Sequence, residues 1–222
     1  MYELIDESIG IKHFVIVSIL LIPLFYSMFK IEYKYLYKFL YCSIFLNLGS
    51  YYSYLVYSNS FNSSIHLPFH LCYLTELCII LSLFFRSKRI YSWLILNSML
   101  GGMVGFVNSN LIFGLHEIEY IHFYLSHFNL LIFVVIAYKS NIFISKSDIF
   151  NSIIANFFIL LFIINFNFLF KSNYWFTFSK PSGLNLSVLF PAWPYYFLIF
   201  ISIGFFSYFL TFLLLLNNRL NR

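Results

Sequence analysis

Seven apolar stretches dominate this sequence, and each approaches the length that a helix needs to cross a lipid bilayer, about 20 residues. They lie at roughly 11–29, 36–57, 66–85, 90–113, 120–138, 149–170 and 188–216. With 61% hydrophobic and 9% charged residues, the chain is too apolar for a water-soluble domain. The sequence therefore predicts an all-α, polytopic membrane protein in which residues 1–222 form a single domain of seven transmembrane helices.

The loops between these stretches alternate in charge. Ten of the 13 Lys and Arg residues fall in one alternating set of loops or at the C-terminus, namely Lys30, Lys34, Lys38, Arg86, Lys88, Arg89, Lys139, Lys146, Arg219 and Arg222. Positive charge marks the cytoplasmic side, and the opposite set of loops carries Glu117 and Glu119. The N-terminus is therefore expected outside and the C-terminus in the cytoplasm, in a multi-pass protein of the cell membrane. Because the basic residues are spread thinly, no nucleic-acid partner is expected.

Cys72 and His127 are expected at the same depth in the membrane. The helices predicted at 66–85 and 120–138 both enter from outside, and at 1.5 Å per residue each of the two side chains lies about 10 Å below the outer boundary. A cysteine is a good nucleophile only as the thiolate, and a nearby histidine can take its proton and later return it to a leaving group. The two residues are therefore candidate catalytic residues for acyl transfer.

Each member of this pair also fits a packing role, because cysteine behaves as a small hydrophobe and an intramembrane histidine often hydrogen-bonds a neighbouring helix. Cys42 and Cys78 are assigned to packing, and three cysteines without CxxC spacing argue against a disulfide framework or a structural zinc site. Glu76 lies one helical turn beyond Cys72 on the same face and is costly to bury unless paired or protonated. It is expected to orient a partner or to line the site.

Further polar groups are expected at the outer end of this pair. Asn173, Tyr174 and Lys180 fall in the predicted loop before the last helix, and amide, hydroxyl or ammonium donors can stabilise the oxyanion of a tetrahedral intermediate. Asparagines near helix ends fit a capping role equally well. His66 and His70 are four residues apart, which is the spacing of a metal-binding pair on a helix.

Small residues and prolines mark two other helices. Gly101 and Gly105 form a small-xxx-small pattern in the fourth stretch, which is typical of close helix packing in membranes. Pro191 and Pro194 are expected in the first turn of the last helix, where a missing N–H is harmless.

Several short motifs resemble a known family. They are LPFHLC at 67–72, FYLSH at 123–127, NYWF at 173–176, KP at 180–181 and PAWPYY at 191–196. In order and spacing they resemble the YwaF-like bacterial integral membrane proteins, over about residues 66–200. That group is similar to a eukaryotic transmembrane acyltransferase family that remodels ether phospholipids and, more distantly, to intramembrane lipid esterases with a hydroxyl nucleophile.

The resemblance implies a catalytic pair, because in the acyltransferase relatives it consists of the Cys of the LC element and the His of the SH element, here Cys72 and His127. The bacterial relatives carry an acidic residue after the cysteine, where this chain has Tyr73, so the role of that acid is open or moves to Glu76. The implied protein is a membrane-embedded lipid acyltransferase or acyl hydrolase that forms a thioester on Cys72, with His127 as base and then acid. His70 is expected to support this catalytic pair, together with Glu76, Asn173, Tyr174 and Lys180.

Membrane lipids are the expected partners. A phospholipid of the outer leaflet would donate the acyl group, and an alcohol, an amine or water would accept it, without a cofactor or metal. Two other classes remain open. A zinc-dependent membrane hydrolase could use His66, His70 and His127 with Glu76, since a catalytic zinc needs three protein ligands. A non-enzymatic transporter or receptor would share the seven-helix topology.

Overall fold

A computed structural model describes the backbone of residues 2–84, 87–109, 111, 115–182 and 185–220, and within these ranges the side chains between residues 10 and 216. This part of the chain is all helical, without strands. The α-helices are α1 (Tyr2–Lys30), α2 (Tyr33–Tyr57), α3 (Leu71–Leu81), α4 (Lys88–Val107), α5 (Glu117–Lys139), α6 (Lys146–Phe170) and α7 (Tyr195–Leu220), and two short 3-10 helices are η1 (Tyr174–Phe176) and η2 (Leu186–Leu189). The predicted all-α fold is confirmed.

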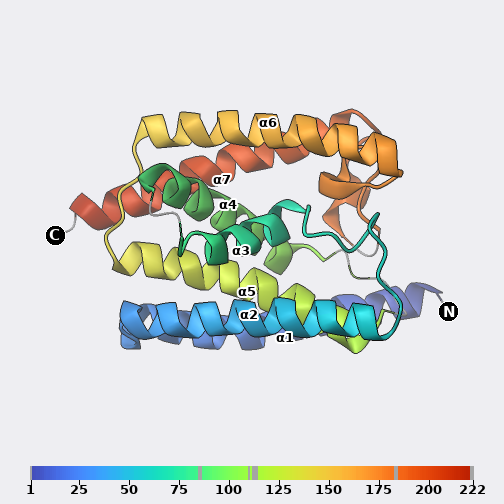
Figure 1. The fold of residues 1–222 in the computed structure, drawn as a ribbon, viewed down its shortest axis with the longest axis horizontal. Helices are drawn as coiled ribbons and strands as arrows, with labels where there is room; N and C mark the ends of the chain where they lie inside the picture. The colour runs from blue at the N-terminus through green and yellow to red at the C-terminus, as the bar shows by residue number, and fades with distance from the viewer. Residues whose placement is uncertain (1, 85–86, 110, 112–114, 183–184, 221–222) are drawn as a thin grey trace.

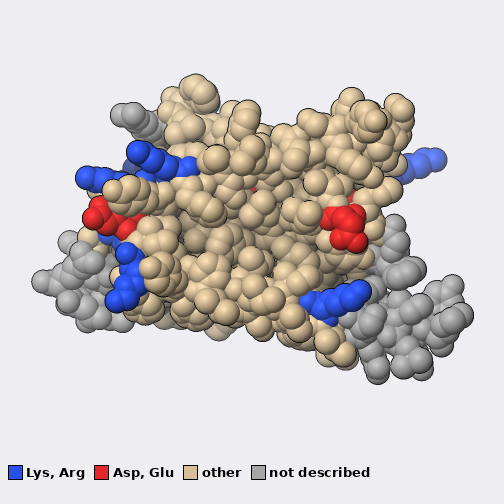
Figure 2. Space-filling model, turned by 90° about the horizontal axis from the view of Figure 1, so that it is seen from below, with Lys and Arg blue, Asp and Glu red and all other residues tan. Residues whose placement is uncertain are grey.

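Five of these helices are long and apolar enough to cross a membrane, namely α1 over Gly10–Lys30, α4, α5, α6 and α7. Large apolar side chains such as Phe150, Phe157 and Phe158 on α6 stay exposed in the isolated chain, as expected where lipid tails replace water as the solvent. Figure 2 shows charged residues near the two ends of the molecule and a broad uncharged band between them. The chain is therefore a multi-pass membrane protein, while the count of seven spans and the orientation of the termini stay predictions.

The third helix is shorter than the sequence predicts. α3 has 11 residues, about 16 Å at 1.5 Å per residue, whereas the hydrocarbon core is about 30 Å thick. The predicted helix at 66–85 begins five residues late because Pro68 disfavours helical backbone in the residue before it and lacks an N–H. Residues 58–70 form turns instead.

The last helix also starts later than the sequence predicts. α7 begins at Tyr195, so Pro191 and Pro194 precede it rather than lying in its first turn. The carbonyl of Pro194 accepts hydrogen bonds from the N–H groups of Phe197 and Leu198. Pro194 therefore caps α7 at the position that needs no N–H of its own.

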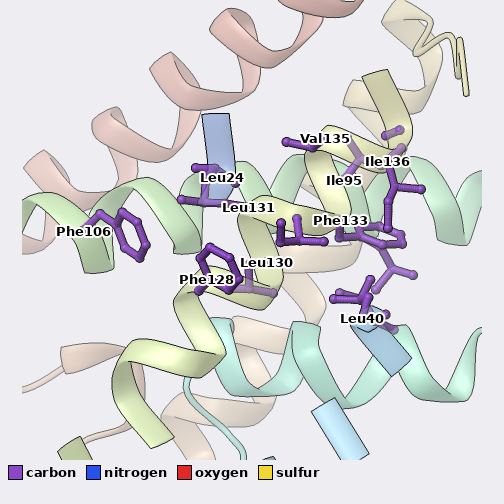
Figure 3. Packing of buried hydrophobic residues seen from close by; sticks show 14 of the residues in the cluster. Leu24, Leu40, Ile95, Phe106, Phe128, Leu130, Leu131, Phe133, Val135 and Ile136 are labelled. Atoms are coloured by element: carbon purple, nitrogen blue, oxygen red, sulfur yellow. The ribbon is translucent and has the colours of Figure 1, made fainter. Parts of the chain in front are cut away.

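Helix α5 lies at the centre of the bundle (Figure 1), where it packs against α1, α2, α3 and α4. The other side of α4 carries α6 and α7. Side chains from four helices meet in the core, among them Leu24, Leu40, Ile95 and Phe133 (Figure 3). The termini lie at opposite ends of the bundle, which agrees with an odd number of crossings. This arrangement places α3 beside both α4 and α5.

Candidate functional site

Cys72 is the second residue of α3 and is partly exposed. The helix begins directly after His70, whose backbone is extended. A Cβ atom added to Gly101 on α4 would lie 3.0 Å from Cys72 Sγ and 3.5 Å from Cys72 Cα. The absence of a side chain at Gly101 therefore lets the backbone of α4 come into contact with the thiol.

His127 lies in the middle of α5 and is 5% exposed. Its Nδ1 atom is 2.6 Å from the carbonyl oxygen of Phe123. A carbonyl only accepts hydrogen bonds, so this geometry assigns the proton of a neutral imidazole to Nδ1 and leaves Nε2 as the basic nitrogen. A Cβ atom added to Gly105 on α4 would overlap the imidazole ring.

The thiol and the imidazole therefore border the same glycine face of α4. Gly101 and Gly105 are four residues apart, so their Cβ positions are about 6 Å apart, which places Cys72 Sγ and His127 Nε2 no more than about 12 Å apart. The ring of Tyr73 lies near the imidazole, with centroids 6.2 Å apart. Within the described part of the chain, no hydrogen bond joins the two candidate catalytic residues.

Glu76 is fully buried among amide groups. Its Oε1 atom accepts hydrogen bonds from Asn129 Nδ2 at 2.9 Å and Asn47 Nδ2 at 3.2 Å. Its Oε2 atom is also buried and has no hydrogen-bond partner among the described residues. The sequence predicted that Glu76 would orient a partner or line the site, and this role stays a prediction. The side chains that donate hydrogen bonds to Glu76 belong to α2 and α5.

These contacts extend into a cluster of buried polar side chains, which we call the Glu76 cluster; it comprises Ser43, Asn47, Glu76, His122, Ser126 and Asn129. Asn47 donates a second hydrogen bond to Ser126 Oγ at 2.9 Å, and its Oδ1 lies 3.2 Å from His122 Nδ1. Ser43 donates to Asn129 Oδ1 at 2.7 Å. The cluster joins α2, α3 and α5 in the interior of the bundle.

The imidazole of His122 lies between two tyrosine rings. Its centroid is 3.9 Å from that of Tyr51 and 4.7 Å from that of Tyr73, with nearly parallel planes. Sequence reasoning missed most of the Glu76 cluster. The sequence feature that could have revealed the cluster is the helical spacing of His122, Ser126 and Asn129. This spacing puts three polar side chains on one face of an otherwise apolar helix.

His70 lies at the entrance of α3 beside the 3-10 helix η1. Trp175 N–H points at His70 Nδ1 at 3.4 Å, and the rings of Tyr174 and Phe176 are 5.1 and 4.9 Å from the imidazole. Burial and, to a smaller extent, the charge of His127 lower the pKa of His70 to about 4, so His70 is neutral at physiological pH. The predicted supporting residue thus lies near both members of the candidate pair.

Tyr174 reaches the turns that precede α3, and its expected role beside the candidate pair stays a prediction. It is 1% exposed. Its hydroxyl donates to the Ser63 carbonyl at 2.8 Å and accepts from Leu67 N–H at 2.9 Å. Asn167 at the end of α6 holds the backbone of Tyr174 through two hydrogen bonds. Tyr174 therefore anchors the turns at 58–70, and its hydroxyl is engaged with backbone groups.

Asn173 and Lys180 hydrogen-bond to residues of their own segment. Asn173 Nδ2 donates to the carbonyl and hydroxyl of Ser179, and its Oδ1 accepts from Phe178 N–H. Lys180 Nζ donates to the carbonyl of Phe190 at 2.6 Å. These hydrogen bonds lie within the segment between α6 and α7, and the oxyanion role expected for the two side chains stays a prediction.

The histidines do not gather into a metal site. Among the described residues, no three His, Cys, Asp or Glu side chains lie close enough together to hold a metal ion. His66 Nε2 instead lies 4.0 Å from Glu119 Oε1. The set of His66, His70, His127 and Glu76 that a zinc hydrolase would need is therefore not assembled.

The fold and the site define an all-helical, multi-pass membrane protein with a thiol and an imidazole beside one glycine face. A family model for the TMEM164 family matches residues 7–212. The chain therefore belongs to the TMEM164 family of transmembrane proteins. The YwaF-like resemblance is not confirmed by that name. Neither a search of curated proteins nor a search of solved structures found a match.

Proposed function

We propose that this protein is a membrane-embedded lipid acyltransferase or acyl hydrolase, with Cys72 as nucleophile and His127 as general base. The observation that supports this most is the shared glycine face of α4, against which both the thiol and the imidazole lie. The tautomer of His127 supports it as well, because the bond from Nδ1 to Phe123 leaves Nε2 basic. A thiol in apolar surroundings needs such a base to become a thiolate.

The reaction proceeds in two halves. In the first, His127 Nε2 takes the proton of the Cys72 thiol, and the thiolate attacks the ester carbon of a lipid. The carbon–sulfur bond forms, the ester carbon–oxygen bond breaks, and the imidazolium returns its proton to the departing alkoxide. In the second half, an alcohol, an amine or water gives its proton to His127 and attacks the thioester, which releases Cys72 as thiolate to recover its proton.

The acyl donor in this proposal is a phospholipid of the surrounding leaflet. Cys72 is partly exposed although it lies in the bundle, which supports access of a lipid in this proposal. With the N-terminus outside, the pair lies in the outer half of a cell membrane, away from cytoplasmic acyl donors. The thiol and imidazole approach hydrogen-bond distance when substrate binds, as catalytic contacts commonly tighten in the substrate complex.

A cysteine series tests this function. Cys72→Ala abolishes acyl transfer, because a nucleophile is chemically irreplaceable, whereas Cys42→Ala and Cys78→Ala retain most of it. His127→Ala is as damaging as Cys72→Ala, and the double variant is no worse than either, since residues that act as a unit lose their effect together. The measurement compares lipid species in membranes with each variant. Wild-type lipid profiles in the Cys72→Ala membranes would refute the proposal.

A further inference from the structure

His13 on α1 hydrogen-bonds to both α5, which carries His127, and α4, against which the His127 ring packs. The imidazole is 3% exposed. Its Nε2 atom lies 3.2 Å from the carbonyl oxygen of Phe106 on α4, and its Nδ1 lies 3.1 Å from the hydroxyl of Tyr124 on α5. The mechanism above does not use this residue.

Both partners of His13 are next to the residues that contact His127. Phe106 follows Gly105, whose backbone lies against the His127 ring. Tyr124 follows Phe123, whose carbonyl accepts the Nδ1 proton of His127 and whose ring lies 4.4 Å from the imidazole. The two hydrogen bonds of His13 therefore fix the two backbone segments between which His127 is held.

The chemistry of these bonds makes His13 a rigid link. The Phe106 carbonyl can only accept, so His13 carries its proton on Nε2 and accepts at Nδ1 from the Tyr124 hydroxyl. Phe106 also lies in the last turn of α4, where carbonyl groups lack partners within the helix. His13 is thus a neutral imidazole with both nitrogens engaged, and it donates a hydrogen bond to the Phe106 carbonyl in apolar surroundings.

We propose that His13 is a positioning residue for His127, a role that rests on the proposed function. By joining α4 to α5 at this level, it keeps Gly105 against the imidazole and the Phe123 carbonyl on Nδ1. This fixes the direction of the basic Nε2 atom relative to Cys72. A shift of about 1 Å in such a group can cost on the order of a hundredfold in rate, so a loosened link lowers turnover without removing a catalytic group.

The test compares two replacements of His13 with a control at the other end of α1. His13→Phe fills the space but removes both hydrogen bonds, whereas His13→Gln keeps a donor and an acceptor. The matched control is Lys139→Met, because Lys139 Nζ also joins α5 to α1 by two hydrogen bonds, to the carbonyls of Ser27 and Met28. That link lies far from His127.

Two readouts are measured for folded protein in a Cys42→Ala, Cys78→Ala background. One is the rate at which a membrane-permeant maleimide labels Cys72 between pH 6 and 9, and the other is the rate of acyl transfer. We expect His13→Phe to slow both by roughly tenfold to a hundredfold, to shift the pH profile of labelling upward, and to leave the KM for lipid nearly unchanged. His13→Gln recovers most of the rate, and Lys139→Met keeps the parent profile.

The outcomes separate this inference from the proposed function. If His127→Ala abolishes both readouts while His13→Phe leaves them at parent values, the positioning role is overturned and the catalytic pair stands. Equal slowing by Lys139→Met would also overturn it, because general loosening of α1 would then explain the effect. If His127→Ala itself changes neither readout, the catalytic pair fails and the role of His13 fails with it.

Discussion

Two halves of the bundle meet at α4 and are held together by different chemistry. On one side, α6 and α7 are joined to α4 by a closed set of neutral side chains, which we call the Asn156 cluster; it comprises Trp93, Asn97, Asn156 and Tyr208. Asn156 accepts from Trp93 Nε1 at 2.7 Å and donates to Asn97 Oδ1 and the Tyr208 hydroxyl. Tyr208 in turn donates to Asn97 at 2.6 Å. Both amide protons of Asn156 and the tyrosine hydroxyl are paired, and Asn97 Nδ2 donates to the carbonyl of Trp93.

On the other side, α3 and α5 meet α4 through glycines, and behind them lies the Glu76 cluster. This cluster contains an ionisable group, Glu76, whose Oε2 has no partner in the part of the chain that the structure describes, which is costly in apolar surroundings. The comparison shows that polar groups in this bundle have two uses. In the Asn156 cluster neutral side chains join three helices through hydrogen bonds. In the Glu76 cluster a carboxyl is incompletely paired among the described residues, which is the pattern expected if this region serves the proposed function.

The largest effect is expected from Gly105→Ala, which tests the glycine side directly. The added Cβ would overlap the His127 ring, so either the ring or α4 must move. Overpacking of this kind typically costs about 1–3 kcal/mol, and the displaced imidazole should also lose its function in acyl transfer. Thermal unfolding in detergent and a lipid assay measure the two effects. Gly204→Ala on α7 is the control, because its Cβ would lie at an ordinary 3.6 Å from Leu100.

Glu76→Gln is expected to separate activity from stability. The substitution keeps the shape and the acceptor for Asn47 and Asn129 but removes a carboxyl that has no ionic partner among the described residues. Stability should stay equal or rise, since a buried ionisable carboxyl is replaced by a neutral amide of the same shape. Acyl transfer should fall by at least about tenfold, which equals about 1.4 kcal/mol of transition-state stabilisation. A less stable variant with full activity would show that the Glu76 cluster is structural.

The opposite pattern is expected for Asn156→Ala. The change leaves the Trp93 N–H and the Asn97 and Tyr208 oxygens without their common partner. An unsatisfied buried group costs about 1–3 kcal/mol, so the unfolding temperature should fall clearly. Activity per folded molecule should not change, because these side chains lie on the α6 and α7 side of α4. If Asn156→Ala lost activity at normal stability, the Asn156 cluster would serve the reaction and its assignment as a structural cluster would be wrong.

The sequence predicted the helical class well because apolar length is set by the bilayer and leaves few alternatives. It also singled out Gly101 and Gly105, whose close contacts are present. It missed the start of α3, where Pro68 outweighs the apolar pattern, and it missed the partners of Glu76. Those partners are asparagines and serines on other helices, and helix periodicity alone cannot say which faces of two helices meet.

His13 illustrates the same limit. It lies in a stretch whose charge and hydropathy suggested only the first transmembrane helix, and its partners Phe106 and Tyr124 are 93 and 111 residues away in the chain. Asn173 and Lys180 show a related limit. They were expected to serve the site because of their place in the loop order, and the hydrogen bonds that they donate go to their own segment. Local bonds of this type compete effectively with distant ones.

The smallest effect is expected from Tyr208→Phe, which removes one hydroxyl from the Asn156 cluster. Side-chain hydrogen bonds between membrane helices are worth about 0.6 kcal/mol on average, and this hydroxyl makes two, to Asn97 and Asn156. We therefore expect a loss of about 1 kcal/mol, detectable as a small fall in unfolding temperature. Tyr195→Phe, at a residue that is 61% exposed, should be silent. In a double-mutant cycle the Tyr208→Phe loss should largely vanish in an Asn156→Ala background, because the shared network is already broken; an additive loss would show that the four side chains do not act as one cluster.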